Sequence, residues 1–158
     1  SNQQPAQTVA VGIDLGSYQS VIAVSQKEHH GHYEQANFRE TPNVVGFGAN
    51  ERYLGEAGQI KHKTNYKDTV TYITRFLGLP PDSSLLDKER KFITVSTETS
   101  GGGRLAFRVN YRGESQIFIA EEVVAAFLNK LRGILELNKI SRDQPVVLSV
   151  PGYYNMFE

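Results

Sequence analysis

The stretch VGIDLGSYQSVIAV, residues 11–24, decides the fold of this chain. Apolar side chains alternate along residues 9–15 and again along residues 21–24, and this pattern predicts two strands. The polar loop GSYQS, residues 16–20, is short enough to join them as a β-hairpin. The sequence thus opens with the first two strands of a sheet.

The two faces of the first predicted strand differ in chemistry. Its bulky side chains share one face: Val11, Ile13 and Leu15. The other face carries small groups and one carboxylate: Gly12, Asp14 and Gly16. A loop of Gly and Ser offers backbone N–H groups and hydroxyls that suit a phosphate, and Asp14 beside it is placed to hold a hydrated Mg²⁺. We interpret this face as a phosphate site; a plain turn, which favours Gly and Ser for conformational reasons, stays open as the alternative.

Length and composition restrict the classes of function. The chain has 158 residues and is 39% hydrophobic, enough for one domain with a real core. Lys plus Arg and Asp plus Glu number 17 each, so no excess positive charge draws the protein to nucleic acid or an anionic membrane. The absence of cysteine excludes disulfides and thiolate metal sites and fits a reducing compartment. We therefore expect no nucleic-acid partner and no membrane partner.

Further strands are predicted where apolar residues alternate between turn residues. In chain order they lie at residues 31–38, 44–47, 53–54, in two or three antiparallel runs within 91–119, and as a buried strand at 146–150. A short helix is predicted after Gly55, and a second begins at Asp68 as N-cap and ends at Gly78. A long helix over residues 120–138 carries one apolar stripe: Val123, Val124, Phe127, Leu128, Leu131, Ile134 and Leu135. The pattern is a mixed α/β arrangement.

Two other possible sites carry weaker signals. SGGGR, residues 100–104, lacks the Lys-Ser/Thr pair of a P-loop and joins two predicted strands, so it predicts a flexible turn. The histidines at 29, 30 and 32 lie in a predicted loop with only Glu28 beside them, which favours a solvated turn over a metal site.

Five short motifs follow one another in the order and spacing found at the start of the ATPase domain of 70-kDa heat-shock chaperones. They are VGIDLGSYQSVIAV, RETPNVVGFG, RYLGEAG, TRFLG and VPGYYN. The chain resembles this family from Val9 onward. VVGFG and LDKERKF are similar to the 110-kDa branch, whose members act mainly as nucleotide-exchange partners of the 70-kDa chaperones and hold unfolded protein.

The resemblance implies an actin-like ATPase fold of the ribonuclease H-like type, an α/β fold of which this chain supplies the first lobe. That lobe is a mixed sheet with packed helices plus a small inserted α/β subdomain. The implied division is a tag or tail at 1–8, the first part of the core subdomain at 9–42, the inserted subdomain at 43–119, and a truncated return to the core at 120–158. The family's second phosphate loop and its adenosine contacts lie further along the chain, so we expect these residues alone to bind ATP poorly and to be inactive.

The family's pattern also implies roles for individual residues. Asp14 lies near Mg²⁺, which it holds through water. The phosphate loop that binds ATP or ADP is lined by Gly16, Ser17, Tyr18 and Gln19. Residues that couple the nucleotide state to the substrate-binding half are Pro151, Tyr153 and Asn155.

Two departures from the family's pattern bear on hydrolysis. Tyr18 is larger than the residue it replaces and would crowd the γ-phosphate. The family carries a lysine immediately before the arginine of TRFLG, which helps position the attacking water and offsets charge on the transferring phosphate; here that catalytic position is Thr74. Loss of such a cation commonly costs orders of magnitude in rate. On a helix Arg75 would point about 100° away and substitute poorly; the alternative is that Thr74 faces solvent and another residue compensates.

The resemblance therefore favours a cytoplasmic ATP-binding co-chaperone. Its parent protein would bind Mg-ATP, hydrolyse it slowly, and serve a 70-kDa chaperone partner as nucleotide exchange factor and holdase, with unfolded clients held by the missing C-terminal part. A conventional ATP-hydrolysing 70-kDa folding chaperone is the first alternative. A sugar kinase of the same superfamily is the second, although TPNVVGFG and VPGYYN are not expected there.

Overall fold

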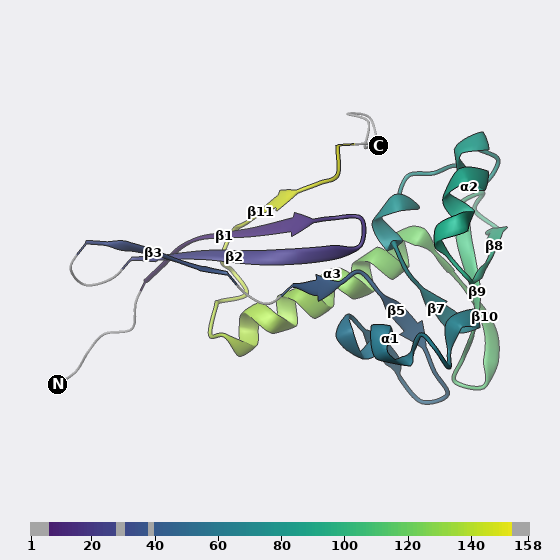
Figure 1. The fold of residues 1–158 in the computed structure, drawn as a ribbon, viewed down its shortest axis with the longest axis horizontal. Helices are drawn as coiled ribbons and strands as arrows, with labels where there is room; N and C mark the ends of the chain where they lie inside the picture. The colour runs from purple at the N-terminus through teal and green to yellow at the C-terminus, as the bar shows by residue number, and fades with distance from the viewer. Residues whose placement is uncertain (1–6, 28–30, 38–39, 153–158) are drawn as a thin grey trace.

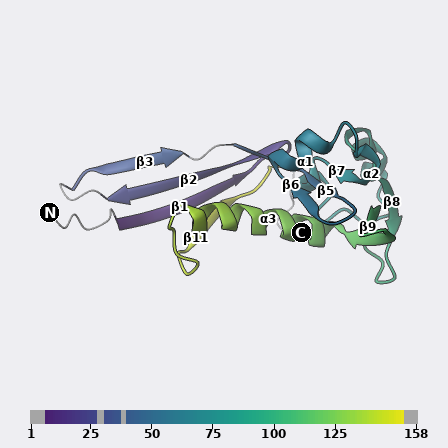
Figure 2. The same cartoon turned by 90° about the horizontal axis from the view of Figure 1, so that it is seen from below.

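The computed structural model describes residues 7–27, 31–37 and 40–152 (Figure 1). A twisted sheet forms one end of an elongated molecule, and two smaller sheets with short helices form the other end. One long helix runs between the two ends (Figure 2). Among the helices of the described ranges, none is both long and apolar enough to cross a membrane.

The first sheet has five strands, and it is mixed, as the family resemblance implies. In chain order they are β1 (Gln7–Leu15), β2 (Gln19–Lys27), β3 (Tyr33–Asn37), β4 (Thr41–Pro42) and β11 (Val146–Ser149). Their order is β11-β1-β2-β3, with β4 pairing to β2. β1 runs antiparallel to β2 and parallel to β11, so the predicted opening hairpin is confirmed.

The two faces of β1 have the different environments that the sequence predicts. Val11, Ile13 and Leu15 are buried in the hydrophobic core. Asp14, on the opposite face, is exposed. The core also contains Ile22 and Val24 of β2. Burying one face of a strand fixes its register, because a slip by one residue would turn the apolar side chains outward.

Two three-stranded sheets make up the other end of the molecule. One has the order β6-β5-β7, with β5 (Val45–Phe47), β6 (Arg52–Leu54) and β7 (Thr69–Val70). The other has the order β10-β9-β8, with β8 (Ser96–Thr99), β9 (Leu105–Tyr111) and β10 (Glu114–Ile119). Arg108 of β9 donates two hydrogen bonds to Glu98 of β8, at 2.6 and 2.7 Å, and these hold the pKa of that carboxyl below its usual value.

Short helices connect these strands. They are α1 (Glu56–Lys61) and α2 (Ser84–Glu89), with the 3₁₀ turns η1 (Tyr66–Asp68), η2 (Ile73–Arg75) and η3 (Arg90–Phe92). α1 follows Gly55 as predicted, and Gly55 has a φ of 64°, a conformation that favours glycine.

The predicted helix starting at Asp68 is wrong. Residues 69–70 form β7, where Val70 pairs with Val45, and the chain then turns at Tyr72, which has a left-handed φ of 51°. A run of β-branched residues at 69–71 favours extended backbone, and pairing with β5 gives that run its partner. Only the single 3₁₀ turn η2 remains of the expected helix.

The long helix α3 (Ala120–Leu137) confirms the predicted apolar stripe. Phe127 and Leu131 have no exposed surface, and Leu128 and Ile134 are partly buried against the core. The stripe meets both ends of the molecule, since α3 contacts β5, β6, β9 and β10 of the small sheets and lines a hollow together with residues of β1 and β11. α3 therefore ties the two ends together.

The strand at 146–150 forms, but it is not buried as predicted. All four residues of β11 are exposed, and Val147 retains 74% of its surface. Among the described strands β11 pairs only with β1, so one edge of it is open. A continuous apolar run predicts a strand covered on both faces. Among the described residues β11 is an edge strand, and Val146 and Leu148 line a hollow beside α3 rather than a closed core.

Candidate functional site

The loop between β1 and β2 has a geometry that requires glycine at its first position. The Gly16 N–H donates to Gln19 O at 3.1 Å and closes the turn. A Cβ at residue 16 would lie 2.4 Å from that same carbonyl oxygen, closer than any real contact. The loop at residues 16–18 therefore has its tight shape because residue 16 has no side chain.

Asn43 binds this loop on the side that faces the protein interior. Its Nδ2 donates to Gly16 O at 2.5 Å, and its backbone N–H donates to Tyr18 O at 2.8 Å. Its Oδ1 accepts a hydrogen bond from Ser20 Oγ at 2.6 Å, which orients the amide. Asn43 and Ser20 are both fully buried. The sequence alone assigned Asn43 no role, although it lies within the quoted motif TPNVVGFG.

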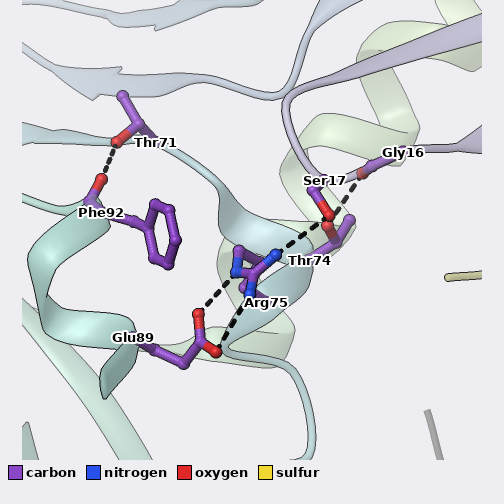
Figure 3. Close-up of polar contacts among 7 residues, drawn as sticks. All are labelled: Gly16, Ser17, Thr71, Thr74, Arg75, Glu89 and Phe92. Atoms are coloured by element: carbon purple, nitrogen blue, oxygen red, sulfur yellow. Dashed lines mark hydrogen bonds and ion pairs between the residues drawn. The ribbon is translucent and has the colours of Figure 1, made fainter. Parts of the chain in front are cut away.

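Thr74 is the second support of the loop. Its Oγ1 donates to Gly16 O at 2.9 Å, and the residue has no exposed surface (Figure 3). The alternative that Thr74 faces solvent is therefore wrong. η2 packs against the loop, so a residue 58 positions away in sequence binds Gly16 directly.

These contacts orient the peptide groups of the loop. In a trans peptide the C=O and the following N–H point in opposite directions, and the described peptide bonds include no cis bond. The carbonyls of residues 16 and 18 point toward Asn43, so the N–H groups of Ser17 and Gln19 point away from it. Two carbonyls that point inward and two N–H groups that point outward favour an anion on the outer side of the loop.

Arg75 also reaches the loop, contrary to the prediction that it points away. Its Nη1 lies 3.4 Å from Ser17 Oγ (Figure 3). Its Nε and Nη2 bind the two carboxylate oxygens of Glu89 at 2.5 and 3.2 Å. The prediction assumed a continuous helix, but η2 is one 3₁₀ turn lying against the loop, so both Thr74 and Arg75 contact it.

Tyr18 points toward the small sheets. Its hydroxyl accepts a hydrogen bond from Gln59 Nε2 on α1, and its ring lies 5.6 Å from the ring of Tyr72. The Tyr72 ring in turn lies 5.1 Å from Phe92. The sequence suggested that Tyr18 would crowd a phosphate. In the structure, residues from the other end of the molecule hold its side chain.

Asp14 lies where the open face of the sheet meets the loop. Its register partners are Val21 on β2 and Ser149 on β11, which places Ser149 beside it on the same face. Next to this pair, the small residues Ala10, Gly12, Ala23 and Ser25 line a hollow of about 190 Å³, together with Val24 between the last two. The predicted small face is confirmed, and Ser149 is a neighbour that the sequence alone did not identify.

The carboxylate of Asp14 fits a hydrated magnesium ion. Asp14 is exposed, and the described residues hold no group of three or more His, Cys, Asp or Glu that could enclose a metal. Mg²⁺ usually keeps several waters and takes one or two carboxylates together with substrate phosphates. One accessible carboxylate beside an anion-favouring loop meets that requirement.

The predicted coupling residues are only partly described. Pro151 is half-buried just after β11, whereas Tyr153 and Asn155 lie outside the described residues. Their role stays a prediction.

Comparison with known proteins gives one consistent result. The family model described as Hsp70 protein matches residues 10–158. The chain is 33% identical over 149 residues, 94% of its length, to a heat shock protein homolog of Eremothecium gossypii. It is 33% identical over 145 residues to a heat shock protein homolog of Saccharomyces cerevisiae, and 33% over 151 residues to the 97 kDa heat shock protein of Strongylocentrotus purpuratus. These matches cover 91% and 94% of the chain. The chain spans only 21%, 21% and 17% of the three relatives.

Proposed function

Because this chain belongs to the Hsp70 protein family and has its actin-like ATPase fold, we propose that residues 14–19 form the first phosphate-binding loop of a nucleotide-binding domain. The ligand is ATP or ADP with Mg²⁺. The observation that carries the proposal is the orientation of the loop, whose carbonyls are held inward by Asn43 and Thr74.

Each residue of the site has a distinct task in this proposal. The outward N–H groups of Ser17 and Gln19 bind phosphate oxygens, and Gly16 permits the turn. Asp14 holds the hydrated cation, which neutralises phosphate charge when bound. The side chain of Tyr18 contacts Gln59 and Tyr72, and so it leaves the outer side of the loop accessible.

We propose the division of the chain that the sequence suggests. Residues 9–42 and 120–158 belong to the core subdomain, and residues 43–119 form the inserted one. The separate sheets support this division, since β1, β2, β3, β4 and β11 share one sheet while β5 to β10 form two others. We also propose, from the family's pattern, that residues 151, 153 and 155 transmit the nucleotide state; of these the structure describes Pro151, which comes soon after β11 of the core sheet.

We propose that the parent protein is an ATP-binding co-chaperone of the cytoplasm. It hydrolyses ATP slowly, releases ADP from a 70-kDa chaperone partner, and holds unfolded clients through parts beyond this chain. Two of the similar proteins are named homologues of heat shock proteins and a third is named a heat shock protein. The neutral, buried Thr74 supports slow hydrolysis, because it supplies hydrogen bonding to the loop but no positive charge.

Calorimetric titration of the full-length protein with Mg-ATP and Mg-ADP tests the loop. Gly16→Ala should lower the affinity for both by at least tenfold, because its Cβ would lie 2.4 Å from Gln19 O and force the loop open. Gly101→Ala is the matched control, since a Cβ there meets nothing within 4 Å. Equal affinity of the Gly16 variant and the wild type would contradict the proposal.

The conventional folding chaperone differs from this proposal in a measurable way. The co-chaperone should accelerate ADP release from a 70-kDa partner while its own turnover stays slow. Fast turnover stimulated by a J-domain protein, with no effect on a partner's ADP release, would establish the folding chaperone instead.

A further inference from the structure

The guanidinium of Arg75 lies against the proposed phosphate loop, where the sequence predicted no positive charge. Its Nη1 edge faces Ser17, with 3.4 Å between Nη1 and Oγ (Figure 3). We propose that Arg75 binds the phosphate chain of the nucleotide from the side of Ser17 and so adds to its affinity. Arg75 does not replace the family lysine at residue 74, so the proposal of slow hydrolysis stands. This inference rests on the proposed nucleotide site and adds a binding residue to it.

The position of the guanidinium is fixed before any ligand arrives. Glu89 receives two parallel hydrogen bonds from it, at 2.5 and 3.2 Å, and the ring of Phe92 lies 4.5 Å below its central carbon. The Arg75 side chain keeps 25% of its surface exposed and that of Glu89 keeps 19%. A held guanidinium loses less entropy on binding than a mobile one, and its planar fork matches phosphate oxygens.

The loop and Arg75 offer complementary groups to the same ligand. The Ser17 N–H points away from Asn43, on the outer side of the loop, and the Ser17 hydroxyl adjoins the Nη1 group. A phosphate bound on that outer side would accept hydrogen bonds from the backbone while its charge is paired by the guanidinium. Charge-assisted hydrogen bonds of this kind are about twice as strong as neutral ones.

Glu89 limits the strength of this interaction. Its carboxylate neutralises part of the Arg75 charge and repels an incoming phosphate. The pair therefore keeps the guanidinium at the loop and moderates its attraction for nucleotide. Removing the negative charge of Glu89 should leave nucleotide binding equal or stronger, because the loss of repulsion offsets the loss of positioning, whereas removing the positive charge of Arg75 should weaken it.

The test is calorimetric titration of the full-length protein and its variants with Mg-ATP. Arg75→Gln should lower the affinity about tenfold. Arg90→Gln is the matched control, because Arg90 also pairs with a carboxylate of α2, Asp87 at 2.7 Å, but bonds to Thr97 rather than to the loop. Its affinity should stay within twofold of the wild type.

Glu89→Gln separates a binding role from a structural one, because it breaks the same ion pair and keeps the charge of Arg75. We expect its affinity for Mg-ATP to equal or exceed that of the wild type. A loss like that of Arg75→Gln would show that the pair only supports the fold, and would overturn the inference. Unchanged affinity in Arg75→Gln would overturn it too, while a wild type that binds no nucleotide would overturn the proposed function itself.

Discussion

Among single residues, Asn43 and Thr74 decide the shape of the loop. Both donate to one carbonyl oxygen, that of Gly16, and both are fully buried. A buried hydrogen bond of this kind contributes about 1 kcal/mol to stability, and more is lost when its partner is left unsatisfied. The second donor limits that loss, because Gly16 O keeps one partner when the other is removed.

Replacement of Thr74 by Val should weaken nucleotide binding through the loop. The change keeps the shape of the side chain and removes the Oγ1 hydrogen bond to Gly16, so the free energy of unfolding should fall by about 1 kcal/mol. Without one of its two donors the Gly16 peptide is less firmly oriented, and the affinity for Mg-ATP should fall about threefold. Urea unfolding and calorimetric titration measure the two effects.

The control for this prediction is Thr71→Val. Thr71 also donates a buried hydrogen bond, at 2.8 Å to Phe92 O, but it does not contact the loop in the described bonds. The free energy of unfolding of Thr71→Val should fall by a similar amount, and its affinity for Mg-ATP should not change. If both variants changed the affinity equally, Thr74 would have no particular role at the loop.

Among the helices and strands, α3 is the element that joins the two ends of the molecule in one hydrophobic core. Its stripe meets the hairpin β1–β2 and the small sheets in one continuous cluster. Phe127 lies within this cluster with no exposed surface. The helix therefore depends on both ends of the molecule, and each end depends on the helix.

Phe127→Ala should lower the free energy of unfolding by about 3 to 5 kcal/mol, the usual cost of the cavity left by a large core side chain. Leu137→Ala on the same helix is the control, because Leu137 is 85% exposed, and its effect should stay below about 0.5 kcal/mol. Denaturant unfolding followed by circular dichroism measures both. Similar losses in the two variants would mean that α3 does not carry the core as described.

At the scale of the whole molecule, one edge of β11 has no partner strand among the residues that the structure describes. The strand exposes Val146, Val147 and Leu148 together with the hydrogen-bonding groups of that edge. Such edges pair with other chains unless a charge or a covering segment prevents it. The 158 residues on their own should therefore self-associate.

Val147→Lys should reduce this self-association, because a lysine on an edge strand opposes pairing with a second copy. Ile60→Lys is the control, since Ile60 is 70% exposed but lies on the helix α1. Sedimentation velocity over a range of concentrations should show a lower association constant for the Val147 variant alone. A monomeric wild-type chain at every concentration would contradict the prediction.

The sequence alone determined the features that depend on local pattern. Alternation predicted the β1–β2 hairpin and the two faces of β1, and the three-four spacing predicted α3, because period and burial are linked directly in strands and helices. Ordered motifs identified the family, which the comparison confirms. Composition excluded disulfides, because the chain contains no cysteine.

Only the tertiary structure decided what depends on contacts between distant segments. The apolar spacing of residues 70–77 fits a helix, but pairing of Val70 with Val45 made part of it a strand. η2, which follows that strand, places Thr74 and Arg75 at the loop, where Asn43 also binds. Arg75 in turn pairs with Glu89, and no local pattern connects these residues. Two hydrogen bonds fix the loop: one joins residues that are 27 positions apart in sequence, and the other joins residues that are 58 positions apart. Packing, and not sequence spacing, selects these partners.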